Sequence, residues 1–211
     1  MTIRRGRDWG APGPLAPGAP VVDTDAALVR AVLPAVEAGH PMEVGLVGGD
    51  LHRTLGSPRH TVAELRAGEG MRLPVDLAEV VLHRPDGTED RTWFCAHLVA
   101  MEARGPLFAG RTVVLMNAAF RGGDNLGPRA HPGDGLLDVT DGRLGWWERR
   151  LARARLATGS HLPHPGLQVA RRASVELTFA APARVTLDGN EAGSAVALEV
   201  ACRRDAVTVV V

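Results

Sequence analysis

Short apolar runs that end in Asp-Gly turns recur along this chain, and they constrain its fold most. Pro85-Asp86-Gly87, Asp134-Gly135 and Asp188-Gly189 each lie beside such a run. Glycine accepts the positive φ that a tight turn requires, so an Asp-Gly pair between two strands is typical of a hairpin. Several short strands at even spacing predict a mainly β fold, a two-sheet sandwich.

Residues 21–60 differ from this pattern. They predict a short strand at 21–22, a helix capped by Asp23 or Thr24, a strand at 43–47 and one helical turn after Gly49. From residue 62 onward the pattern becomes strand-like, with Trp93–Val99 as one strand. We therefore divide the chain into an extended arm at 1–20, a small α/β remnant at 21–60 and a β-sandwich domain at 61–211.

Composition excludes several functions. Acidic and basic residues balance at 24 each, so no net positive charge favours binding to nucleic acid. The chain has no lysine and no tyrosine, which removes a phosphate-binding P-loop lysine and Schiff-base chemistry. Two isolated cysteines suit neither a disulfide framework nor a thiolate metal site. Without a leader or an apolar run long enough for a transmembrane segment, we expect a cytoplasmic protein.

Two stretches allow both a functional and a structural interpretation. Gly48-Gly49-Asp50 leads into a helical turn and could hold phosphate with backbone N–H groups, or the glycines could merely permit a tight turn. Residues 131–139 carry Asp134 and Asp138, with Asp141 close behind. Carboxylates this dense suit a hard cation or a ring of structural hydrogen bonds.

Residues 144–157 predict a helix, because Leu144, Trp147, Leu151 and Ala154 recur at helical spacing. Five arginines between residues 143 and 155 accompany a Trp pair. Such a helix could meet phosphates or an anionic membrane surface. More often it docks its apolar stripe on a sheet and leaves its arginines in water, which is the interpretation we favour here.

Four blocks in order resemble the C-terminal domain of the diacylglycerol kinase-like lipid kinases, the relatives of NAD kinases and sphingosine kinases. The blocks are Val114–Asn117 followed by Gly122-Gly123, Gly127-Pro128 through Asp134–Val139, Thr158–His161 with His164–Gly166, and Leu187–Gly189. Upstream, residues 44–47 and 50–58 are similar to the family loop that lies near the nucleotide. The resemblance names Asn117, Gly48, Gly49 and Asp50 as candidate ligand-binding residues.

The resemblance also implies a catalytic position and a metal site. In these kinases a glutamate two residues after the turn aspartate takes the proton of the acceptor hydroxyl. This chain has Asp188 in the turn and Asn190 at the glutamate position, with Glu191 next, so Asp188 and Glu191 are the candidate catalytic residues. A structural Mg²⁺ would be held by Asp134 and the backbone of Leu136, unless Asp134 caps its own turn.

Two functions follow from this resemblance. An amide at the base position, together with a missing nucleotide-binding half, predicts a truncated, catalytically degenerate member that does not depend on ATP. Such a pseudoenzyme would bind a lipid or a phosphorylated small molecule, or act in regulation. The alternative is an active lipid kinase, phosphorylating a diacylglycerol-like lipid, that a homo-oligomer or a separate nucleotide-binding chain completes.

Overall fold

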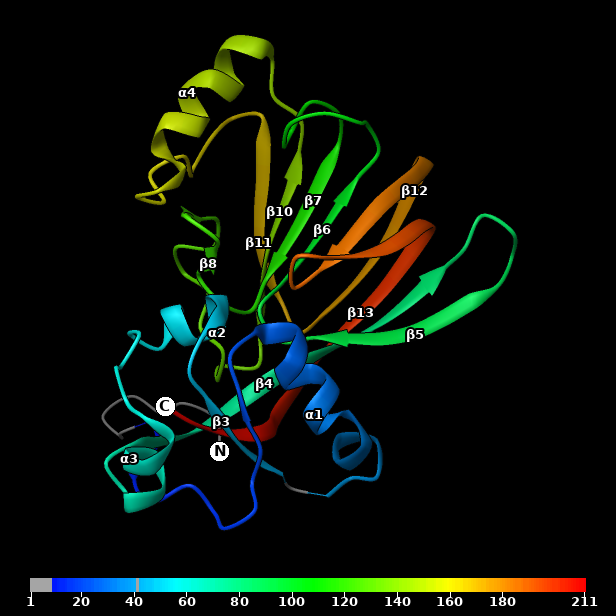
Figure 1. The fold of residues 1–211 in the computed structure, drawn as a ribbon. Helices are drawn as coiled ribbons and strands as arrows, with labels where there is room; N and C mark the ends of the chain where they lie inside the picture. The colour runs from blue at the N-terminus through cyan, green and yellow to red at the C-terminus, as the bar shows by residue number, and fades with distance from the viewer. Residues whose placement is uncertain (1–8, 41) are drawn as a thin grey trace.

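The computed structural model describes residues 9–40 and 42–211. Within them, eleven strands form one curled, mostly antiparallel sheet, and two short strands form a separate hairpin (Figure 1). The large sheet comprises β1 Ala11–Pro12, β2 Val21–Val22, β3 Glu43–Leu46, β4 Met71–His83, β5 Glu89–Phe94, β6 His97–Met101, β7 Thr112–Met116, β10 Leu137–Gly142, β11 Leu167–Arg172, β12 Ser174–Leu187 and β13 Asn190–Val210; the hairpin is β8 Phe120–Arg121 and β9 Asp124–Asn125. The prediction of a mainly β fold is confirmed.

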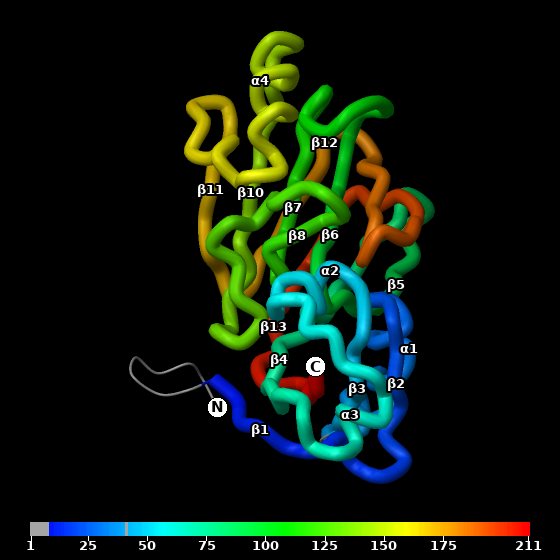
Figure 2. Tube along the Cα trace, turned by 60° about the vertical axis from the view of Figure 1, so that its left-hand side comes forward, coloured from blue at the N-terminus to red at the C-terminus, as the bar shows by residue number. Residues whose placement is uncertain are grey.

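Four helices lie in the described residues: α1 Asp25–Glu37, α2 Gly49–Thr54, α3 Val62–Ala67 and α4 Trp146–Leu156. The first three lie at one end of the molecule and α4 at the other, in both views (Figures 1 and 2). In this part of the chain no helix is long and apolar enough to cross a membrane.

Two long strands, β4 and β13, join the ends of the molecule. They pair antiparallel from Arg72↔Val210 to His83↔Ala197. The sheet then continues in the order β13-β12-β6-β7-β10-β11 on one side, while β3 adds to β13 in parallel and β2 adds to β3. The segment 21–60 is therefore continuous with the main sheet, and the boundary at residue 60 stays a prediction.

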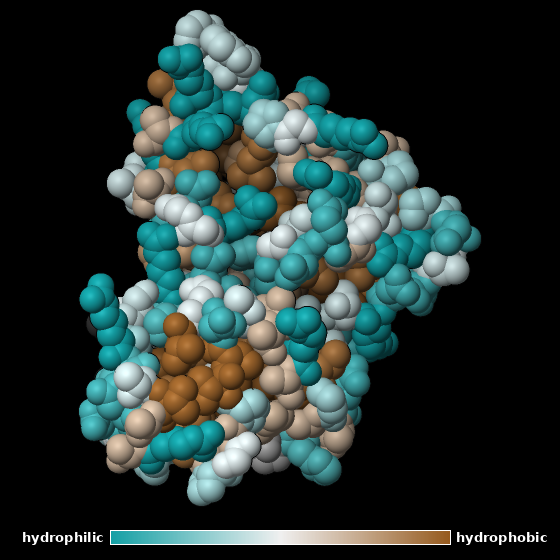
Figure 3. Space-filling view, in the orientation of Figure 1, coloured by the Kyte–Doolittle hydropathy of each residue, from teal (hydrophilic) through white to brown (hydrophobic). Residues whose placement is uncertain are grey.

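Buried side chains form a core on each side of this sheet. The largest cluster includes Phe94, Leu115 and Leu198, and lies between the strands of the curl. A second cluster forms where α1 and α2 cover the sheet. A third lies under α4 and includes Met116, Leu144 and Leu156; Figure 3 shows its apolar colour between α4 and the strands below.

The first helix begins as its sequence predicts. The Thr24 hydroxyl accepts the N–H of Ala27 at 3.3 Å and so caps α1, whose residues Leu28 and Val32 are fully buried. Pro34 lies inside the helix and removes one N–H donor there.

Three local predictions are wrong, each for a physical reason. Residues 62–67 are the helix α3 and not strand, because Thr61 and Glu64 form a reciprocal capping box. The run Trp93–Val99 is two strands, since the backbone at Cys95 and Ala96 bends away from the ladder. Of the apolar stripe predicted for α4, Leu144 is buried, but Trp147, Leu151 and Ala154 face solvent, because the helix packs through Ala152 and Leu156 instead.

Candidate functional site

The turn that joins β12 to β13 is well defined. Leu187 and Asn190 pair at the strand ends, so Asp188 and Gly189 form a two-residue turn with φ of 47° and 81°. Positive φ at both positions is what a type I′ turn requires, and Asp-Gly is a favoured pair for it. The Asp188 N–H donates to the His97 carbonyl at 2.9 Å, which holds the turn against β6.

The Asp188 carboxylate explains the break between β5 and β6. It accepts the backbone N–H groups of Cys95, Ala96 and His97, each at 2.9 Å. These donors therefore face the turn and not a neighbouring strand. A carboxylate that accepts three N–H groups has little capacity left for another partner.

Asn117 holds the same bend from the other side. Its Nδ2 donates to the carbonyls of Cys95 at 2.7 Å and Asp76 at 2.9 Å, and the side chain is fully buried. Its Oδ1 has no hydrogen-bond partner within the described residues. The ligand-binding role predicted for Asn117 stays a prediction, and its observed contacts are structural.

The Gly48-Gly49 turn leads into α2, and the carboxylate of Asp25 already accepts N–H groups at the start of this helix. Asp25 accepts the N–H of Asp50 at 2.7 Å and of Leu51 at 3.1 Å. A side chain at Gly48 would meet the carbonyl oxygen of Asp23 at 2.3 Å. A phosphate at this helix end would have to replace the Asp25 carboxylate, so the ligand role of Gly48, Gly49 and Asp50 remains a prediction.

Asp50 and His97 link the helical end to the sheet. His97 Nε2 lies 3.1 Å from Asp50 Oδ2, and the other oxygen of Asp50 accepts the Gly122 N–H at 2.8 Å. Only 1% of the His97 surface is exposed. The structure thus gathers Asp25, Asp50, His97 and Asp188 where α1 and α2 meet the strand ends.

Electrostatics differ among these carboxyls. Burial, and then the nearby Asp188 charge, raise the pKa of Asp25 to about 6. Burial also raises the pKa of Asp188, against the opposing effect of its N–H donors. The hydrogen bond from His97 is the main cause that lowers the pKa of Asp50. Asp50 is therefore the carboxyl of this group whose surroundings favour the charged form, whereas burial disfavours the charged form of Asp25 and Asp188.

The two catalytic candidates line one cleft but make different contacts. Asp188 is committed to the backbone of residues 95–97, whereas the Glu191 side chain is 63% exposed and lies 3.5 Å from Arg184. Asn190 is exposed, and its Nδ2 donates to the Asp188 carbonyl at 3.4 Å. The turn therefore presents an amide where the family resemblance calls for a carboxylate.

A cleft of about 660 Å³ opens beside this turn. The first turn and a half of α1 forms one wall, with Thr24, Ala26 and Arg30. The other walls come from β4, β5 and the β12–β13 turn, including Arg84, Asp188 and Asn190. Arg84 is paired with Asp90 at 2.7 Å. Arg30 is exposed and has no paired carboxylate in the described part of the chain.

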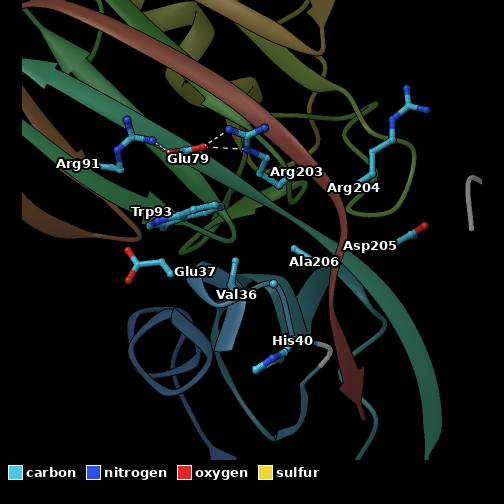
Figure 4. Close-up of a pocket in the computed structure, with 11 residues that line it drawn as sticks. Val36, Glu37, His40, Glu79, Arg91, Trp93, Arg203, Arg204, Asp205 and Ala206 are labelled. Atoms are coloured by element: carbon cyan, nitrogen blue, oxygen red, sulfur yellow. Dashed lines mark hydrogen bonds and ion pairs between the residues drawn. The ribbon is translucent and has the colours of Figure 1, made fainter. Parts of the chain in front are cut away.

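A second cavity, of about 590 Å³, lies between the end of α1 and β13 (Figure 4). Glu79 lies between Arg91 and Arg203 and forms ion pairs with both. Glu37 and Asp205 also line this cavity, so its three carboxylates balance its three arginines.

The predicted Mg²⁺ ligands lie apart from both cavities, in the loop before β10. The Asp134 Oδ1 accepts the N–H of Leu136 at 3.0 Å, and its other oxygen pairs with Arg171. Arg171 also binds Asp138 at 2.9 Å. A cation at Asp134 would have to displace Arg171, so these residues as placed do not fit Mg²⁺, and the site remains a prediction.

Among residues 9–40 and 42–211, no cluster of three or more His, Cys, Asp or Glu side chains is arranged to hold a metal. The carboxylates of Asp134 and Asp138 make hydrogen bonds to Leu136 and Arg171, contacts of the kind that the second interpretation of residues 131–139 predicts.

Sequence reasoning missed Asp25, Asp76, His97 and Arg30. Each is a single polar residue in an apolar run or on a helix, and no motif marks it. The one available signal is an acidic residue inside a buried strand, Asp76, because a buried carboxylate must find hydrogen-bond donors.

Comparison with known proteins identifies the family of this domain. The model of the YegS C-terminal NAD kinase beta sandwich-like domain matches residues 92–211, which is more than half of the chain. No curated protein matches.

Solved structures with a similar fold include kinases. A diacylglycerol kinase from Bacillus anthracis str. Sterne superposes with a TM-score of 0.64 at 13% identity, over 90% of this chain and 76% of that one. Another structure from the same bacterium gives a TM-score of 0.67 with the same identity and coverage. Yeast NADH kinase complexed with NADH gives 0.50 at 8% identity, over 90% of this chain and 61% of that one.

At such identities the structural likeness concerns the fold alone, whereas the family match rests on the sequence. The predicted resemblance to diacylglycerol kinase-like proteins is confirmed. This chain belongs to the family of the YegS C-terminal NAD kinase beta sandwich-like domain.

Proposed function

We propose that this protein binds a lipid headgroup or another phosphate-bearing small molecule in the cleft beside the β12–β13 turn, and that it does not transfer phosphate by itself. The observation that carries the proposal is the state of that turn, where Asp188 accepts three backbone N–H groups and Asn190 replaces a carboxylate.

The turn lacks a working general base. An amide does not accept the proton of an attacking hydroxyl, and loss of a general base costs roughly a hundred- to ten-thousand-fold in rate. Glu191 lines the cleft, but it is one residue beyond the position and its exposed side chain lies 3.5 Å from Arg184. Phosphoryl transfer needs the nucleophile positioned as well as activated, so a displaced carboxylate is a poor substitute.

The cleft is lined by the carboxyls of Asp90, Asp188 and Glu191, but it also has two features that suit an anion. Arg30 stands exposed at its rim, and guanidinium groups bind phosphate oxygens in pairs. The N-terminal turn of the 13-residue helix α1 lines the same wall, where the helix dipole favours negative charge. Such a binding or regulatory role agrees with the cytoplasmic location expected from the sequence.

The test uses dihexanoyl phosphatidic acid, dihexanoylglycerol and inorganic phosphate as probes. We expect the phosphatidic acid to raise the melting temperature by several degrees at saturation, because a ligand at 100 times its Kd adds about 2.7 kcal/mol. Arg30→Gln should abolish the shift, whereas Arg59→Gln, an exposed arginine outside the cleft, should leave it unchanged.

Phosphorylation of dihexanoylglycerol is followed in the same samples with Mg-ATP. We expect no turnover. Turnover by the pure chain would overturn the proposal that the protein does not transfer phosphate, and would favour a lipid kinase. If the turnover per chain rises with protein concentration, an oligomer completes that kinase. No thermal shift with any probe would overturn ligand binding.

A further inference from the structure

An uncovered face of α4 combines aromatic, apolar and basic side chains. Trp146, Trp147 and Leu151 are 57%, 67% and 60% exposed, the three most exposed large apolar residues of the described chain. The rings of Trp146 and Trp147 contact each other edge-on, with centroids 4.4 Å apart. Single exposed apolar residues are ordinary, but three in one helical turn and a half need an explanation.

The orientation of α4 causes this exposure. The helix rests on the sheet through Ala152 and Leu156, beside the buried Leu144. Successive residues are about 100° apart around a helix, so Trp147 and Leu151 point away from that contact. In Figures 1 and 2 the helix forms the tip of the molecule, opposite α1–α3.

Positive charge surrounds this apolar face. Residues 143–155 hold five arginines and one glutamate, a net charge of +4 in a chain whose total is zero. The glutamate, Glu148, accepts the Gly145 N–H at 2.6 Å and so caps its own helix. Arg150 and Arg153 lie on one side of the apolar residues and Arg155 on the other, all exposed.

We propose that this face of α4, the Trp147 face, docks the protein on a bilayer of anionic phospholipids. Tryptophan prefers the membrane–water interface, where its ring is buried and its N–H stays wet. Leu151 would enter the acyl boundary, while the flanking arginines would reach phosphate groups and gain from the negative surface potential.

A second copy of the chain fits this face less well. Two such helices would bring +4 against +4, and a stable interface buries about 800 Å² per partner, more than one turn and a half of helix presents. The inference is independent of the cleft beside Asp188, because that cleft lies among α1, β4, β5 and the β12–β13 turn.

Vesicle flotation tests the proposal without any ligand for the cleft. We expect the full chain to bind vesicles of phosphatidylcholine with 30% phosphatidylglycerol at least tenfold better than vesicles of phosphatidylcholine alone. Raising the salt from 0.1 to 0.5 M should weaken binding, because exposed charges are screened. Brominated acyl chains should quench only part of the tryptophan fluorescence, since Trp93 is buried and Trp9 is half-buried in the core cluster beside α1, away from α4.

Two variants separate the apolar and charged contributions. Trp147→Ala with Leu151→Ala keeps every charge, and Arg150→Gln with Arg153→Gln keeps every apolar residue; we expect each pair to weaken binding at least tenfold. The matched control is Arg59→Gln with Arg172→Gln, two exposed arginines away from α4 that should not affect binding. Far-UV circular dichroism confirms that each variant is folded.

Absence of binding to the anionic vesicles would overturn the proposal. Equal loss of binding in the control pair would overturn the assignment to α4. Light scattering that shows a dimer, lost in the Trp147→Ala and Leu151→Ala variant and accompanied by no vesicle binding, would assign the face to contacts between copies instead.

Discussion

Buried aspartates secure the connections of this fold. Asp25, Asp76 and Asp188 each accept two or three backbone N–H groups from distant parts of the chain. Asp76 is fully buried in β4 and binds Gly135 at 2.6 Å and Asp205 at 2.8 Å. Such bonds satisfy backbone N–H groups in turns and bulges, where no neighbouring strand supplies an acceptor. The carboxylates therefore shape the loops around the candidate site.

The pH dependence of stability should reflect the protonation of the Asp76 carboxyl. Burial raises its pKa from 3.8 to about 6, so the folded protein holds this proton more tightly than the unfolded chain. Stability from this group is therefore highest below pH 4 and falls as the pH rises to 6. Relative to Asp76→Asn, the free energy of unfolding of the wild type should fall by about 2 kcal/mol between pH 4 and 6.5.

Urea unfolding at pH 4, 5 and 6.5 measures this difference. The control is Asp86→Asn, because hydrogen bonds from Thr88 lower the pKa of the exposed Asp86 and any effect lies below pH 4. A difference between the wild type and Asp76→Asn that stays constant over this range would contradict the prediction.

At the scale of elements, the close packing of two connecting segments decides which residue can stand at position 48. The link from β3 to α2 passes so near the segment before α1 that a Cβ at Gly48 would lie 2.3 Å from the Asp23 carbonyl oxygen. The φ of Gly48 is −170°, which any residue adopts, so the constraint is space and not conformation. A glycine that resembles a phosphate loop in sequence thus has a packing role in the structure.

Gly48→Ala should destabilise the protein by about 2 kcal/mol, because the backbone of Asp23 must move to relieve the overlap. Gly123→Ala is the matched control: its φ is not positive and its Cβ would meet no atom within 4 Å. Chemical denaturation compares the two. Equal stability of both variants would show that the Gly48 connection adapts without cost.

At the scale of the whole molecule, β4 and β13 make one cooperative unit. β4 pairs along nearly its full length with residues 197–210 of β13, and β13 also carries the parallel strand β3. Separate unfolding of the α1–α3 end would have to break hydrogen bonds in strands shared with the rest. The molecule is therefore expected to unfold in one step.

Two probes test this expectation. In a Trp146→Phe, Trp147→Phe variant the remaining tryptophans, Trp9 and Trp93, report on the α1 side of the sheet. Their fluorescence and the far-UV circular dichroism of the whole chain should give the same urea midpoint. A fluorescence transition at lower urea would mean that segment 21–60 unfolds separately, as the sequence-based domain division suggests.

The sequence determined the local features of the fold. Asp188-Gly189 predicted the turn between the paired strands β12 and β13, because turn preference depends on neighbouring residues. It did not predict the α3 helix, whose six residues are too few for a periodic signal. It also favoured the wrong face of α4, since Trp147 and Leu151 are apolar wherever they point.

The tertiary structure decided which side chains meet. Asp25 reaches Asp50, Asp76 reaches Asp205, and Asp188 reaches Cys95, contacts that span from 25 to 129 positions along the chain. Nothing local specifies such pairs, because a carboxylate has the same chemistry in a turn, in a cation site or on a buried N–H group. The long-range register of β4, β12 and β13 brings donors and acceptors together, and it gives structural contacts to several residues that the sequence offered as ligands.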